Sequence, residues 1–382
     1  MKIAPLYHAL KKKTWANPVI VHTGQHYDIN MSDAFFQDLG LPSPDIHLGA
    51  GSGTHAEQTG KVMMAYEKVI QDTKPDLIVV VGDVNSTVAC TMAAVKILYK
   101  NGKKFKLNGE IIRRPIVAHL EAGLRSFDRA MPEEINRIVT DSLADILWTP
   151  SPDADDNLRR EGIAPERIIR VGNIMIDSLE MLRAKIESQE AYSDFHLQPS
   201  TYAVVTIHRP SNVDDPQTLK SVCEALTKIS QKIPLIFPIH PRTRKNLHKY
   251  GLLSQLDKNE RLFLPEPISY ARFMNLVFNC RLVITDSGGI QEETTYLGIP
   301  CLTLRPNTER PVTITHGTNE LCTLENLEEK VSNMLNGYHK QPEKIEYWDG
   351  KTAQRIVEHL EGLAVEPEDQ STQIFKRPLA AK

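Results

Sequence analysis

Short runs of apolar, mostly β-branched residues recur along this chain, and amphipathic stretches of helical length separate them. The runs lack the polar alternation of a half-exposed strand, so we expect both faces of each strand to be buried. Such strands belong to parallel sheets that helices cover on both faces. The pattern predicts a doubly wound α/β fold with strands at 18–22, 76–81, 115–120, 146–149, 168–171, 202–207, 235–238, 282–285 and 300–304.

The expected helices lie between these strands and carry apolar residues at helical spacing. They cover residues 55–71, 86–99, 133–144, 215–232 and 270–279. The chain opens with a helical pattern at Lys2–Lys13, where a doubly wound domain normally begins with a strand. Residues 101–114 include five Lys or Arg residues, and we expect them to form a solvated basic loop.

A length of 382 residues exceeds what one hydrophobic core usually serves, so two domains are expected, and two domains imply a cleft. A charged helical pattern at 176–200 precedes a fresh strand, which marks the start of a second α/β unit. We predict Rossmann-like domains at 1–175, completed by a C-terminal helix at 352–365, and at 176–351. The polar residues 366–382 are expected to form a disordered tail.

Charge and cysteine content restrict the partners and the compartment. The formal net charge is −3, so no global charge favours nucleic acid or an anionic membrane. The five cysteines lack CxxC and metal-finger spacing, which predicts free thiols in a reducing, cytoplasmic compartment.

No apolar run approaches the roughly 20 residues of a membrane span, and no signal-peptide core is expected. We expect no metal site, since the thirteen histidines show no HExxH spacing.

The segment Thr285–Glu293 points to a phosphate-binding turn. A strand runs into Ser287, Gly288 and Gly289, and a helix is expected to follow. Glycines let a ligand approach the backbone, and free amides at a helix start suit a diphosphate. Downstream, Arg310 supplies a guanidinium for charge-assisted bonds to the phosphates, and Glu292 or Glu293 is placed to accept from a ribose.

Acidic residues gather at the strand ends of the first half. Asp83 follows one predicted strand, Glu121 follows the next, and Glu133 and Glu134 begin a helix with Pro132 in its first turn. Ligands of open α/β sheets bind beyond the carboxyl ends of strands. Helix capping alone would explain Glu133 and Glu134. Three acidic sites at one cleft indicate general acid and base chemistry instead.

In the second half, two strands end in histidine. His208 is followed by Arg209, and His240 is followed by Arg242. A lone histidine at a strand end is usually structural, but two with nearby arginines indicate an anion-lined cleft. The chain has no GxxxxGK[ST] loop for a nucleoside triphosphate and no GxSxG elbow for a nucleophilic serine. It also has no clear GxGxxG after a strand for a hydride-transfer cofactor, so we expect no nucleotide cofactor.

At these residues the chain resembles the non-hydrolysing UDP-N-acetylglucosamine 2-epimerases, whose two Rossmann-like domains face a cleft in the GT-B arrangement. The shared motifs lie at 82–83, 119–125, 132–137, 172–173, 208–209, 285–293 and 308–311. The resemblance implies a homodimer that interconverts UDP-GlcNAc and UDP-ManNAc without a cofactor. It implies anti elimination of UDP to 2-acetamidoglucal, followed by re-addition.

The resemblance also implies roles for individual residues. Asp83, Glu121 and Glu133 become catalytic acids, and His208 lies close to the diphosphate. The implied ligands of UDP or the substrate are Lys2, Arg125, Arg137, Arg209, His240, Ser287, Gly288, Gly289, Glu293 and Arg310. Gln25, His26 and Lys61 stand at the position of a possible allosteric UDP-sugar site. The family's first strand and its Gly-Thr-Arg-Pro-Glu turn are expected to be absent.

Three alternatives remain open from the sequence. A 2-epimerase of a related UDP-sugar, such as UDP-diacetamido-glucuronate, would carry extra cations for the sugar carboxylate. A UDP-sugar glycosyltransferase would share the fold and the UDP site but would not need three acids around the sugar. A non-catalytic UDP-sugar-binding protein would bind its ligand without turnover.

Overall fold

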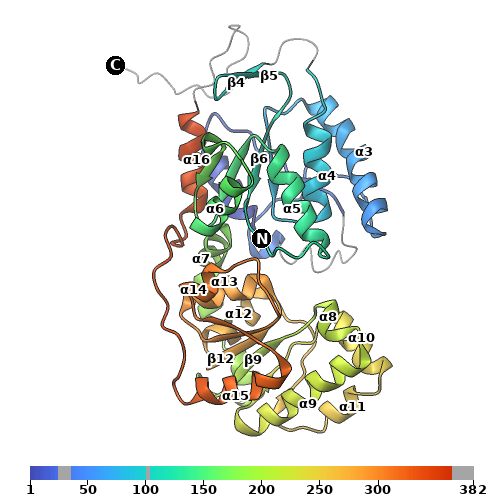
Figure 1. Cartoon of the computed structure of the whole chain (residues 1–382), viewed down its shortest axis with the longest axis vertical. Helices are drawn as coiled ribbons and strands as arrows, with labels where there is room; N and C mark the ends of the chain where they lie inside the picture. The colour runs from blue at the N-terminus through green and yellow to red at the C-terminus, as the bar shows by residue number, and fades with distance from the viewer. Residues whose placement is uncertain (25–35, 100–103, 364–382) are drawn as a thin grey trace. The chain divides into compact units, whose positions relative to one another are not determined.

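The computed structural model describes residues 1–24, 36–99 and 104–363, shown in Figure 1. The chain divides into two compact units, of which unit 1 comprises Met1–Ser178 and the segment from Glu346 onwards, and unit 2 comprises Leu179–Ile345. Helices and parallel strands alternate in both units, so the predicted α/β class is confirmed. Gln25, His26 and the tail at 366–382 lie outside the described residues, and the predictions for them stay predictions.

Unit 1 contains a four-stranded parallel sheet of order β3-β6-β7-β8 and a separate parallel pair, β1-β2. Its elements are α1 (Ala4–Lys11), β1 (Val21–His22), β2 (Ile46–His47), α3 (His55–Thr73), β3 (Leu77–Val81), α4 (Asn85–Ala94), β4 (Phe105–Leu107), β5 (Glu110–Ile112), β6 (Ile116–Leu120), α5 (Pro132–Leu143), β7 (Ile146–Thr149), α6 (Pro152–Arg160), η1 (Pro165–Arg167), β8 (Ile168–Arg170), the start of α7 (Ile174–Glu187), and α16 (Thr352–Gly362). The predicted opening helix corresponds to α1.

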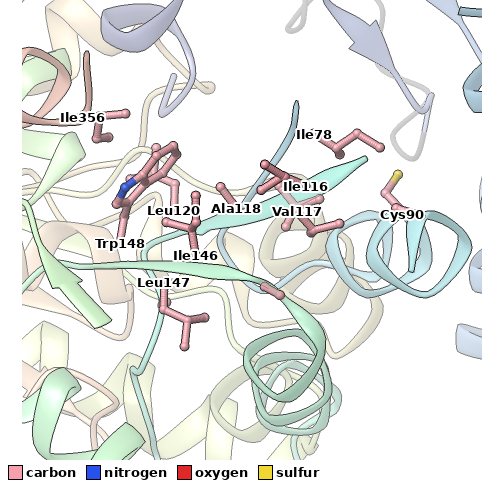
Figure 2. Close-up of a cluster of buried hydrophobic side chains, with 14 of the residues drawn as sticks. Ile78, Cys90, Ile116, Val117, Ala118, Leu120, Ile146, Leu147, Trp148 and Ile356 are labelled. Carbon is pink, nitrogen blue, oxygen red and sulfur yellow. The ribbon is translucent and has the colours of Figure 1, made fainter. Parts of the chain in front are cut away.

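Figure 2 shows the core of unit 1, where β6 and β7 supply most of the labelled side chains. All residues of both strands are buried, which explains why their sequences lack polar alternation. Trp148 of β7 is fully buried, and its Nε1 donates to Nδ1 of His359 on α16 over 3.3 Å. The C-terminal helix therefore completes the core of unit 1.

The basic segment departs from the prediction. β4 and β5 form an antiparallel hairpin, which turns at Asn108 and Gly109 with φ angles of 50° and 85°. A tight two-residue hairpin needs positive φ at both turn residues, and Asn-Gly suits it best. Phe105 and Leu107 are buried in the unit 1 core, so a solvated loop is the wrong description of this segment. The Asn-Gly pair between two apolar stretches was the overlooked signal.

Unit 2 contains one six-stranded parallel sheet of order β11-β10-β9-β12-β13-β14. Numbered along the chain this is 3-2-1-4-5-6, the Rossmann order, and it reverses between β9 and β12, where such sheets bind ligands. The elements are η2 (Ala191–Phe195), β9 (Ala203–Thr206), α8 (Pro210–Val213), α9 (Pro216–Lys232), β10 (Leu235–Ile236), α10 (Pro241–Lys249), α11 (Leu253–Leu256), β11 (Leu262–Phe263), α12 (Tyr270–Phe278), β12 (Leu282–Thr285), α13 (Gly288–Leu297), β13 (Cys301–Leu304), α14 (Val312–Thr315), β14 (Asn319–Cys322) and α15 (Leu324–Leu335).

Candidate active site

Two of the predicted acids lie side by side in unit 1, because β3 and β6 pair in parallel with Val81 opposite Leu120. Asp83 follows β3, is 27% exposed at its side chain, and forms an ion pair with Arg137 of α5. Glu121 follows β6, is 4% exposed, and pairs with Lys2. Each predicted acid is therefore held by a cation that we had assigned to substrate binding.

The backbone at these strand ends is tightly constrained. Gly82 adopts a φ of 67°, and a Cβ added to it would lie 3.2 Å from both Glu121 Oε2 and Lys2 Nζ. Glu121 itself has a φ of 74°, a left-handed conformation that costs free energy in a non-glycine residue. Such strain concentrates at functional sites, where the surrounding structure imposes it.

The two glutamates that begin α5 have different environments. Glu133 is exposed in the first turn of α5, whose N-cap residue Met131 makes no side-chain capping bond. Glu134 is buried, and its carboxylate accepts from the amides of Ser126 and Phe127, both over 2.9 Å. It also accepts from Arg137 over 2.8 Å, so Glu134 orients the guanidinium that pairs with Asp83. From the sequence we assigned a catalytic role to Glu133 and none to Glu134, so this role of Glu134 was missed.

Arg125 is buried and paired within unit 1. We predicted it to contact UDP or the sugar, but its side chain is 1% exposed and its guanidinium is occupied within the protein. It donates twice to Glu161 over 2.7 Å and lies 2.7 Å from Asp141. Two carboxylates of the protein therefore hold the guanidinium, and the ligand role of Arg125 stays a prediction.

In unit 2, the predicted phosphate-binding turn lies at the strand-order reversal. Ser287 precedes α13, whose first amides have no acceptor within the helix. A Cβ added to Gly288 would lie 2.5 Å from Arg310 Nη1 and 2.8 Å from Glu309 Oε1. Only glycine therefore lets Arg310 lie across the helix start. The structure brings Ser287, Gly288, Gly289 and Arg310 together, which is the geometry for binding an anion.

Glu309 holds this arginine in place and was missed as a functional residue. Its carboxylate lies 2.5 Å from Arg310, 2.8 Å from Arg305 and 3.6 Å from Arg209. Burial alone would raise the pKa of Glu309, but Arg310 and Arg305 outweigh burial and hold that pKa below its usual value. Arg310 also lies 3.0 Å from Glu292, so carboxylates on two sides fix the guanidinium.

Glu293 is a buried carboxyl group with a raised pKa. It is 2% exposed, and burial, with a smaller contribution from Glu292, raises its pKa to about 8. The hydroxyl of Tyr270 donates to Glu293 Oε1 over 2.6 Å. The predicted ribose ligand is therefore largely protonated at neutral pH.

The two predicted histidines also lie at the strand-order reversal. Asp286 is fully buried and accepts from the amides of His208 and Arg209 over 2.9 Å and 2.8 Å, which joins the ends of β9 and β12. The rings of His208 and His240 are 5.3 Å apart. His240 Nδ1 accepts from the amide of Arg242, and burial, followed by His208 and Arg242, lowers the pKa of His240.

Three further predictions concern Lys61, metal ions and membrane-spanning helices. Lys61 is exposed on α3, and nothing in the structure tests an allosteric role for it. Within residues 1–24, 36–99 and 104–363, no cluster of three His, Cys, Asp or Glu side chains is arranged to hold a metal ion. A search of the same ranges finds no helix with the length and apolar character needed to cross a bilayer.

The chain thus contains two Rossmann-like α/β units, one with acids at its strand ends and the other with a glycine-rich helix start beside arginine, and both features are typical of ligand-binding α/β proteins. A family model described as UDP-N-acetylglucosamine 2-epimerase matches residues 8–361, and the chain belongs to this family. Two relatives of this chain are named UDP-N-acetylglucosamine 2-epimerase, and epimerases are isomerases.

Individual relatives agree with this assignment. The chain is 42% identical to the UDP-N-acetylglucosamine 2-epimerase of Methanocaldococcus jannaschii, with 94% of this chain and 95% of the relative covered. It is 38% identical to the UDP-2,3-diacetamido-2,3-dideoxy-D-glucuronate 2-epimerase of Pseudomonas aeruginosa, with 94% and 96% covered. The crystal structure of the M. jannaschii enzyme with UDP-GlcNAc and UDP has a TM-score of 0.81 at 41% identity, covering 94% and 95%. The predicted fold is confirmed.

Proposed function

We propose that this protein is a UDP-N-acetylglucosamine 2-epimerase that interconverts UDP-GlcNAc and UDP-ManNAc. The observation that carries the proposal is the placement of Asp83 and Glu121 at adjacent strand ends, each paired with one cation, in a chain of this family. A glycosyltransferase would need the UDP site but not this set of acids.

The proposed reaction begins when a carboxylate removes the proton from carbon 2 of the sugar. The bond between carbon 1 and the diphosphate oxygen breaks on the opposite face, UDP leaves with the electron pair, and a carbon 1 to carbon 2 double bond forms. A carboxyl group then protonates carbon 2 on the other face, and UDP adds back to carbon 1. Every proton and electron pair is returned, so the reaction consumes no oxidant or reductant.

In this mechanism, Asp83, Glu121 and Glu133 supply the carboxylates of unit 1. Departure of UDP builds positive charge at carbon 1, which carboxylates stabilise. In unit 2 the amides around Gly288 and the guanidinium of Arg310 stabilise the charge that develops on the diphosphate. We further assign Glu293 to the ribose, and His208, Arg209 and His240 to the surroundings of the diphosphate.

We also propose a cytoplasmic homodimer. Free, buried thiols at all five cysteines are typical of a reducing compartment. Light scattering on the purified chain should give twice the mass of one chain, and a monomer with full activity would contradict the dimer.

The decisive experiment incubates the purified protein with UDP-GlcNAc in deuterium oxide and follows the sugar by NMR. We expect deuterium at carbon 2 and the appearance of UDP-ManNAc. UDP-diacetamido-glucuronate, assayed in parallel, should react far more slowly, and the reverse preference would assign the chain to that substrate. Binding of UDP with no exchange in either sugar would favour the non-catalytic alternative and remove the enzyme proposal.

A further inference from the structure

A buried polar network lies directly behind the acids of unit 1. Its centre is His119, the one polar residue of β6, whose side chain is 0% exposed. The ring Nε2 is 2.8 Å from the carbonyl oxygen of Gly82, and Nδ1 is 2.6 Å from Oδ1 of Asp141 on α5. Since a carbonyl oxygen can only accept, His119 Nε2–H donates to Gly82. One imidazole thus joins β6 to the end of β3 and to α5.

Asp141 anchors the other side of this network. It is fully buried, accepts from the amide of Gly123 over 3.1 Å, and lies 2.7 Å from Arg125. Burial alone would raise the pKa of Asp141, but His119 and Arg125 outweigh burial and lower that pKa. The carboxylate therefore stays charged and holds the imidazole in one orientation.

The three elements that His119 joins are the three that carry the proposed acids. Asp83 follows the Gly82 carbonyl directly, Glu121 lies two residues after His119, and Glu133 begins the helix that contains Asp141. Gly82 has a φ of 67°, and glycine has the widest conformational freedom of any residue. Gly82 could therefore adopt other backbone angles, and the hydrogen bond from His119 to the Gly82 carbonyl oxygen restricts it to one conformation.

We propose that His119 is a positioning residue, whose Nε2–H fixes the Gly82 peptide and so the direction in which Asp83 leaves β3. The inference rests on the proposed function, because it assumes that Asp83 reacts with the sugar. A displacement of a reacting group by about 1 Å can lower turnover by about 10²-fold without a change in substrate binding.

Two substitutions separate the contacts of the ring. The side-chain amide nitrogen of Asn lies near the place of histidine Nδ1, and that of Gln lies near the place of Nε2. His119→Gln therefore keeps a donor toward Gly82, whereas His119→Asn keeps one toward Asp141. We expect kcat to fall about 10²-fold in His119→Asn, with KM within about threefold of wild type, and about tenfold or less in His119→Gln.

A merely structural role predicts a different result. In that case kcat would fall equally in both variants, in proportion to their loss of thermal stability, and this outcome would overturn the proposal. If the His119 variants fail to fold, Asp141→Asn should still lower kcat with an unchanged KM, and a wild-type kcat there would overturn it too. An inactive wild type would reject the proposed function itself, whereas an active wild type with two fully active His119 variants would reject only the role of His119.

Discussion

Both units consist of parallel strands and helices, but the strands that precede the candidate site residues have different numbers of neighbours in the two sheets. In unit 2, β9 and β12 lie in the interior of a six-stranded sheet, with a hydrogen-bonded neighbour on each side. In unit 1, β3 has a neighbour on one side only among the described strands, and β1-β2 form a separate pair. A strand at a sheet edge is fixed less firmly. Unit 1 compensates with the buried network of His119, Asp141 and Arg125 behind the strand ends.

The charges at the two sets of strand ends also differ. Unit 1 presents Asp83 and Glu121, which pair with Arg137 and Lys2, whereas unit 2 presents a helix start with Arg310 across it. Under the proposed function, unit 1 performs the proton chemistry and unit 2 binds the diphosphate. Substitutions of the acids in unit 1 should therefore leave UDP affinity unchanged, and substitutions at the helix start in unit 2 should leave the proton chemistry unchanged.

The largest expected effect is on turnover. Asp83→Asn keeps the shape of the side chain but removes its charge, so turnover should fall by about 10³-fold with UDP affinity within about twofold of wild type. Steady-state kinetics and calorimetric titration with UDP measure the two quantities. Asp156→Asn, at an exposed carboxylate of α6, is the control. A parallel loss of UDP affinity in Asp83→Asn would contradict the division between the units.

The next effect distinguishes two buried arginines. Arg125→Met removes the cation that pairs with Asp141 and Glu161, while Asp141 keeps its contacts with His119 and the Gly123 amide. This change should lower the free energy of unfolding by about 3 kcal/mol and leave UDP affinity unchanged. Arg310→Met should weaken UDP binding by about 30-fold, or about 2 kcal/mol. Urea unfolding and UDP titration on both variants test the pair. Equal losses of UDP affinity would restore the ligand role that we first predicted for Arg125.

A smaller effect is expected from Gly288→Ala. The added Cβ would displace the Arg310 guanidinium from the helix start, so UDP affinity should fall by about tenfold, or about 1.4 kcal/mol. Gly362→Ala is the matched control, because no atom lies within 4 Å of its added Cβ. Wild-type affinity for UDP in Gly288→Ala would show that the close approach of Arg310 is not needed.

The smallest effect concerns the pH dependence of stability. Glu293 has its pKa raised from 4.5 to about 8, so the folded state binds a proton that the unfolded state releases. This contribution is complete below pH 4.5 and is lost as the pH rises through about 8. Between pH 7 and 8 the unfolding free energy should fall by about 1 kcal/mol more in wild type than in Glu293→Gln. Identical profiles for the two proteins in urea unfolding would show that Glu293 is ionised at neutral pH.

Much of the fold could be predicted because long buried strands leave a continuous apolar pattern. The runs at 146–149 and 282–285 coincide with β7 and β12. Neither β11 nor β14 was predicted, and in β14 the polar residues Asn319 and Glu320 interrupt the apolar pattern. Such strands are defined by their neighbours in the sheet rather than by their own side chains.

The placement of the candidate site residues was predictable where a motif keeps them close in sequence or at adjacent strand ends. Gly288, Arg310, Asp83 and Glu121 belong to this group. Burial and pairing are decided by distant segments, so the sequence did not distinguish Arg125 from a ligand-binding arginine. For the same reason the sequence did not show that Glu134 and Glu309 hold the guanidinium groups of Arg137 and Arg310.

The dependence of unit 1 on α16 has a consequence for synthesis. Trp148 and its partner His359 are separated by 211 residues, and Ile356 and Leu360 of α16 are fully buried in the same core. During synthesis β7 leaves the ribosome long before α16, the helix that covers Trp148. Unit 2 is continuous in sequence, so all of its residues are synthesised before α16. Nascent unit 1 must therefore keep an apolar face exposed while unit 2 folds, and a chain cut before α16 should aggregate rather than fold.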